Sequence, residues 1–184
     1  LLGFLGGYLI NYGGNIIINF YLTKEDLGIF NLAFRLFSNI SSLILLVNTY
    51  YASFVVNIIT EKKRTSIYQF YFHLRPFLII VFLLGTILSF LFGPTIILFI
   101  FKEKYQLAIK PFLVLILANL PLSLEVFYIS VYNTLNKHVV LQIVTIGQAA
   151  VSLGLMIILI PQKGIMGAVS AIAISYYAKT IFSY

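Results

Sequence analysis

Residues 76–101 read PFLIIVFLLGTILSFLFGPTIILFIF, an apolar run without a single charged side chain. A helix that crosses the hydrocarbon core of a bilayer needs about 20 mostly apolar residues, and this run exceeds that length. Further uncharged stretches cover residues 1–23, 36–60, 138–162 and 164–178. The pattern predicts an all-α, polytopic integral membrane protein.

The composition excludes the other broad classes of protein. Of the 184 residues, 61% are hydrophobic and only 9% are charged, which is far more apolar side chain than one soluble core can bury. The same numbers exclude a disordered chain, which needs low hydrophobicity and high charge. The chain has no cysteine and only two histidines, so we expect neither a disulfide framework nor a metal site.

One region departs from the charge-free pattern, because Glu125 lies between Lys110 and Lys137 within an otherwise apolar segment. We interpret that segment as a further span that carries an intramembrane carboxylate. The sequence therefore predicts a single membrane lobe of six helices. Because position 1 is Leu and the last apolar pattern runs up to Tyr184, we expect this lobe, residues 1–184, to be a fragment of a longer chain. The predicted helices cover residues 3–22, 26–57, 74–101, 105–134, 138–160 and 164–183.

The basic residues are spread over the loops between the spans, which favours the membrane surface rather than nucleic acid as their partner. The densest cluster holds Lys62, Lys63 and Arg64. Short basic loops mark the cytoplasmic side of a membrane, so we expect this loop to be cytoplasmic.

Local signals place some helix ends. Thr23 and Asp26 have the spacing of a capping box, which predicts the start of the second helix there. Pro121 lies well inside the fourth span, where we expect a break. Gly167, Ala171 and Ser175 recur every four residues and predict a close-packing surface on the sixth helix.

Polar side chains recur on one face of the first, second and fifth helices and on two faces of the fourth. Such residues can hydrogen-bond one helix to the next, or they can line a shared hydrated cavity. We expect a cavity, because packing needs only a few polar contacts per interface. The candidate substrate-binding residues are Arg35, Asn11, Asn15, Asn31, Ser38, Ser42, Asn119, Ser123 and Gln142.

Two intramembrane charges are the sharpest functional candidates. Arg35 can either extend to the interface or face the cavity, where its planar fork suits phosphate or carboxylate. Glu125 can be a neutral, hydrogen-bonded residue between helices or a cation or proton site. It is the candidate for ion coupling.

Several segments, in this order, resemble the polysaccharide flippases, the O-antigen-type branch of the multidrug/oligosaccharidyl-lipid/polysaccharide exporter superfamily. The similarity covers essentially the whole chain. The segments are LTKEDLGIFNLA (22–33), FGP (92–94), KY (104–105) leading into AIKP (108–111), LNK (135–137) and LIPQKGIMGA (159–168).

The resemblance implies the C-terminal six-helix lobe of a two-lobe, alternating-access transporter. It implies transport of undecaprenyl-diphosphate-linked oligosaccharide across the bacterial cytoplasmic membrane, for cell-envelope polysaccharides such as lipopolysaccharide. The implied partners are this substrate, membrane lipids, an N-terminal lobe and polysaccharide assembly machinery. A cationic cavity is also implied, and Arg35 fits it.

Two alternatives stay open. One is an ion-coupled exporter of small molecules on the same fold, for which Glu125 matters most. The other is a membrane glycan polymerase or transferase, which should have a long extramembrane loop with catalytic residues. The short predicted outer loops and the missing nucleotide-loop and hydrolase motifs disfavour it. We therefore expect a protein with no catalytic residues and no cofactor.

Overall fold

The computed structural model describes residues 8–61, 68, 72–73 and 75–183. The elements in these residues are helices, and the described part of the chain contains no strand. In chain order they are η1 (a π-helix, Leu9–Gly13), α2 (Gly14–Tyr21), α3 (Lys24–Glu61), α5 (Arg75–Phe101), η3 (a 3₁₀-helix, Glu103–Ala108), α6 (Ile109–Ile116), α7 (Asn119–Thr134), α8 (His138–Lys163) and α9 (Ile165–Ser183).

Four helical segments among the described residues are long and apolar enough to cross a membrane. They are Arg75–Phe101, Glu103–Thr134, His138–Lys163 and Ile165–Phe182. This confirms the all-helical class and indicates a membrane protein. The predicted spans 3–22 and 26–57 are not among the four, so the six-helix lobe stays a prediction.

The first two predicted helices differ from the observed ones at their ends. Residues 3–7 lie outside the described part, and the described helix begins with η1 before α2 ends at Tyr21. α3 runs from Lys24 to Glu61, longer at both ends than the predicted 26–57. Its start is fixed by the expected capping box. The Asp26 amide donates to Thr23 Oγ1 at 3.2 Å, and the Thr23 amide and hydroxyl donate to Asp26 Oδ2.

The predicted fourth span, 105–134, corresponds to the segment Glu103–Thr134, which the structure divides into η3, α6 and α7. The expected break lies at Leu117–Ala118, just before Pro121. Proline has no amide hydrogen, and its ring clashes with the carbonyl four residues earlier, which is that of Leu117. Pro121 therefore sits in the first turn of α7, where a missing amide costs no helical hydrogen bond.

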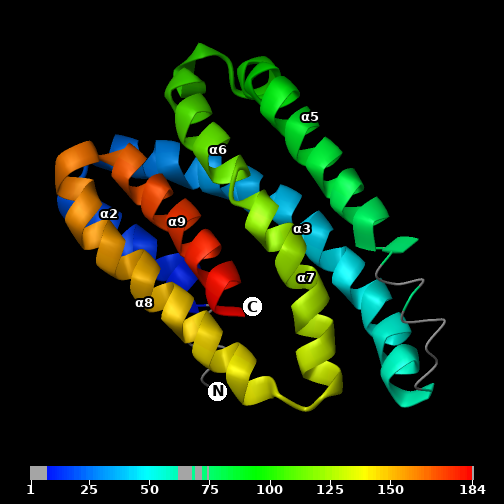
Figure 1. Ribbon diagram of the computed structural model, residues 1–184. Coiled ribbons are helices and arrows are strands. Elements are labelled where there is room, and N and C mark those ends of the chain that lie inside the picture. Colours follow the sequence, from blue (N-terminus) through cyan, green and yellow to red (C-terminus); the bar gives the residue numbers. More distant parts are fainter. Residues whose placement is uncertain (1–7, 62–67, 69–71, 74, 184) are drawn as a thin grey trace.

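Figure 1 shows α8 and α9 as an antiparallel pair on one side, α5 on the other, and α6–α7 between them. The α8–α9 turn is made by Gly164, which has φ +56°, a conformation that glycine adopts without strain. A Cβ on Gly167 would overlap the backbone carbonyl of Leu159, and Ala171 and Ser175 are buried. The predicted close-packing surface on the sixth helix is confirmed.

The main apolar core lies where α3 crosses α6 and α9. Phe30, Ala33 and Phe37 on α3 are almost completely buried, as are Leu115 and Ile116 on α6. On α3, the half-buried Leu32, Phe34 and Leu36 pack beside these buried side chains.

Candidate functional site

The α3 helix has two opposite faces of different chemistry. Phe30, Ala33 and Phe37 face the core, whereas Arg35 and Ser38 are exposed. Successive residues of an α-helix are about 100° apart, so Arg35 and Ser38 lie on the side of α3 opposite the core stripe.

The sequence-predicted residues of α3 share this exposed side. Ser42 is also exposed, and its hydroxyl donates to the Asn39 carbonyl at 2.7 Å, while Asn31 is half-buried. We call Asn31, Arg35, Ser38 and Ser42 the α3 polar face. Arg35 lies eleven residues past Lys24, so it stands about 16 Å along the helix from its start.

Two predicted cavity residues of the fourth helix lie in the bundle interior instead. Asn119 is completely buried, and the Ser41 hydroxyl of α3 donates to Asn119 Oδ1 at 2.7 Å. Ser123 is also buried, and its hydroxyl donates to the Leu120 carbonyl at 2.7 Å. Asn119 therefore joins α3 to the break in the fourth helix, the packing role that polar residues take in membrane bundles.

The remaining candidates lie elsewhere. Asn15 on α2 and Gln142 on α8 are half-buried. The side chain of Asn11 lies outside the described residues. The structure thus groups the α3 candidates on one face but does not bring them against Asn119 or Ser123.

Glu125 makes a buried ion pair with Lys179 between α7 and α9. Their side chains are only 6% and 12% exposed, respectively. Tyr176, one turn before Thr180 on α9, lies beside Gln148 of α8 and close to Glu125. A carboxylate, an ammonium, a phenol and an amide are therefore collected where α7, α8 and α9 meet.

The break in the fourth helix is closed by hydroxyl groups of α9. The Tyr177 hydroxyl donates to the Leu117 carbonyl at 3.0 Å, and the Thr180 hydroxyl donates to the Pro121 carbonyl at 3.3 Å. Irregular backbone inside a membrane is tolerated where neighbouring groups satisfy its freed polar atoms. α9 therefore donates hydrogen bonds to the carbonyls at the helix break and also pairs with Glu125. Glu125 lies one turn after Pro121 on α7.

Sequence reasoning missed the contribution of α9. It used Lys179 only to mark the end of an uncharged run, although Lys179 lies inside the predicted span 164–183. A lysine in one predicted span and a glutamate in another are expected to find each other, since unpaired charges inside a membrane are costly. That signal was present in the sequence.

Among the described residues, no group of three histidine, cysteine or acidic side chains could hold a metal ion. The chain matches no protein-family profile, no curated protein and no solved structure.

Proposed function

We propose that this chain is one lobe of a transporter that moves lipid-linked oligosaccharide across the bacterial cytoplasmic membrane. The observation that carries the proposal is the α3 polar face, which lies opposite the apolar core and includes an arginine well inside the helix. The substrate class rests on the sequence resemblance to polysaccharide flippases.

The polar face needs a partner other than lipid. A charged side chain at the centre of a bilayer costs about 2.5–3.5 kcal/mol on insertion scales. A second lobe would cover this face and enclose water between the two lobes, as alternating access at a midplane site requires. Arg35 would then offer its bidentate fork to the diphosphate of the substrate.

Export of glycan in a flippase-deficient strain tests this proposal. In the intact protein, we expect Arg35→Ala to abolish most export and Arg35→Lys to retain part of it, because lysine keeps the charge but loses the fork. Lys102→Ala removes an exposed cation between α5 and η3 and serves as the matched control, with export unchanged. Normal export by Arg35→Ala at wild-type protein levels would show that Arg35 is only an interfacial anchor.

The buried Glu125–Lys179 pair favours a second candidate, an ion-coupled exporter of small molecules. Ionisable groups inside membrane bundles often belong to proton or ion pathways, and Glu125 of this pair lies about two turns beyond a helix break. Under this alternative, collapse of the proton or sodium gradient should stop efflux of a cationic dye by the intact protein. Glu125→Gln should have the same effect. If the intact protein exports glycan but shows no dye efflux, the small-molecule exporter alternative is rejected.

A further inference from the structure

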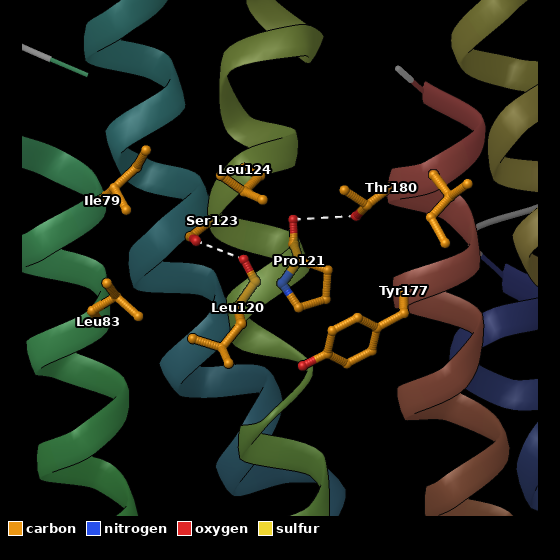
Figure 2. A pocket seen from close by; sticks show the side chains of 9 residues that line it. Ile79, Leu83, Leu120, Pro121, Ser123, Leu124, Tyr177 and Thr180 are labelled. Carbon is orange, nitrogen blue, oxygen red and sulfur yellow. Dashed lines mark hydrogen bonds between the residues drawn. The ribbon is translucent and has the colours of Figure 1, made fainter. Parts of the chain in front are cut away.

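A groove runs between α5 and α9, with α7 as its floor (Figure 2). Its volume is about 300 Å³, and Ile79 and Leu83 of α5 face Leu120 and Pro121 of α7 across it. A second hollow of about 300 Å³ continues along α5 and shares Leu83 and Leu120 with the first. The two therefore form one channel along α5, which we call the α5 groove.

The α5 groove follows a single row of side chains. Ile79, Leu83, Ile87 and Leu91 line it, and residues four apart lie one above the other on a helix. From Ile79 to Leu91 this row spans about 18 Å at 1.5 Å per residue. One leaflet of a hydrocarbon core about 30 Å thick is about 15 Å deep, so the groove is as long as the acyl part of one lipid.

The walls of the groove present hydrocarbon, because its hydroxyl groups are already bonded to the protein backbone. Ser123 and Thr180 donate to carbonyls of α7, and Tyr177 donates to the Leu117 carbonyl. Thr86 donates to the Phe82 carbonyl at 2.8 Å. A sugar or a polar drug would find few partners here, whereas a hydrocarbon chain needs none.

The surroundings of the groove indicate which hydrocarbon fills it. α5, α7 and α9 all belong to segments able to cross a membrane, so the groove opens toward lipid. Arg75, the first residue of α5, lies four residues before Ile79 in the same row. α5 has 27 residues and is about 40 Å long, so its ends reach the headgroup regions. A lipid with its chain in the groove would place its phosphate at the level of Arg75, the basic residue at this end of the row.

We propose that the α5 groove binds an acyl chain of an anionic phospholipid whose phosphate contacts Arg75. The proposal is independent of the transported substrate, since it concerns the side of the bundle formed by α5, α7 and α9, while the proposed transport site lies on α3. A lipid held in this way would fill the space that the bend of the fourth helix opens against α5.

The chain has no tryptophan, so an introduced one adds a single emitter to it, and the fluorescence of the unsubstituted protein is subtracted as background. Phe90 lines the groove, whereas Phe92 lies on the other side of α5 and is 57% exposed. We would reconstitute the intact protein carrying Phe90→Trp or Phe92→Trp into nanodiscs of phosphatidylcholine. A minor fraction of the nanodisc lipid would carry brominated acyl chains and would be either phosphatidylglycerol or phosphatidylcholine. Quenching of the tryptophan fluorescence by the bromine atoms would be measured.

We expect brominated phosphatidylglycerol to quench Phe90→Trp with an apparent affinity about fivefold higher than brominated phosphatidylcholine, the factor given by one basic side chain near a headgroup. Phe92→Trp should show no preference. Adding Arg75→Gln to the Phe90→Trp protein should remove its preference for phosphatidylglycerol, whereas adding Arg75→Lys should keep it. Lys110→Gln removes an exposed cation of α6 and, as the control, should not change the preference.

Equal quenching by the two lipids would overturn the proposal, because the groove would then take any bilayer chain. A Phe90→Trp that neither lipid quenches would also overturn it, since a second copy or another protein segment would then cover the groove.

Discussion

The buried pair between α7 and α9 makes a sharp prediction about stability. Glu125→Gln removes one charge and leaves the Lys179 ammonium in a site where its side chain is 12% exposed. Breaking a buried pair by removing one partner costs about 3–5 kcal/mol, because the remaining charge is desolvated without compensation. At about 4 Å and an effective dielectric constant of about 20, the lost attraction alone is about 4 kcal/mol. We therefore expect the free energy of unfolding to fall by about 3–5 kcal/mol.

The double variant Glu125→Gln/Lys179→Gln separates the pair from its surroundings. With both charges removed, no ammonium is left without its carboxylate, so we expect much of the lost stability to return. Glu103→Gln removes an exposed carboxylate at the start of η3 and is the matched control. Its effect should stay within about 0.5 kcal/mol, as for most surface changes.

Unfolding of the purified intact protein by sodium dodecyl sulfate in mixed micelles provides the measurement. Near-ultraviolet circular dichroism, to which this chain contributes 13 tyrosines, reports loss of tertiary packing. Strictly additive effects of the two single substitutions would refute the reasoning, because a direct pair must give a coupling energy.

Three further predictions concern packing, topology and capping. Gly167→Leu should destabilise the protein by about 1–3 kcal/mol in the same assay because its side chain meets backbone of α8, whereas Gly154→Leu, whose Cβ would enter open space, should not. Single cysteines placed at Ser66 and at Gln162 in this cysteine-free chain should be labelled differently by an impermeant maleimide in intact cells. Labelling at Ser66 would contradict the predicted cytoplasmic location of its loop. Thr23→Ala should lower the free energy of unfolding by about 1 kcal/mol, because the Asp26 amide loses the hydroxyl that caps it, and an unchanged value would show that the cap is dispensable.

The part of the fold that could be predicted depends on local patterns. The third span was predicted as 74–101 and is observed as Arg75–Phe101, because its length and apolar composition match a bilayer. The fifth was expected to start at residue 138, where α8 begins. Its end was predicted at residue 160, whereas α8 continues to Lys163 with Pro161 in its last turn.

Prediction of the candidate site was less complete. The common face of Asn31, Arg35, Ser38 and Ser42 follows from the period of one helix, so sequence alone could group them. Whether Asn119 faces a cavity or another helix depends on which helix packs against it. The structure places it against Ser41 of α3, a contact that no pattern within the fourth helix could show.

The sequence by itself determined the helical membrane class, the cap at Thr23 and the break at Pro121. These features arise from the bilayer thickness and from backbone groups within four residues of each other, so the local order of residues is enough to set them. Only the tertiary structure decided that α9 closes the break and pairs with Glu125. Tyr177 and Leu117 are 60 residues apart, and their contact depends on the rotation and depth of two packed helices. Many side chains set that geometry together, which is why no single stretch of sequence contains it.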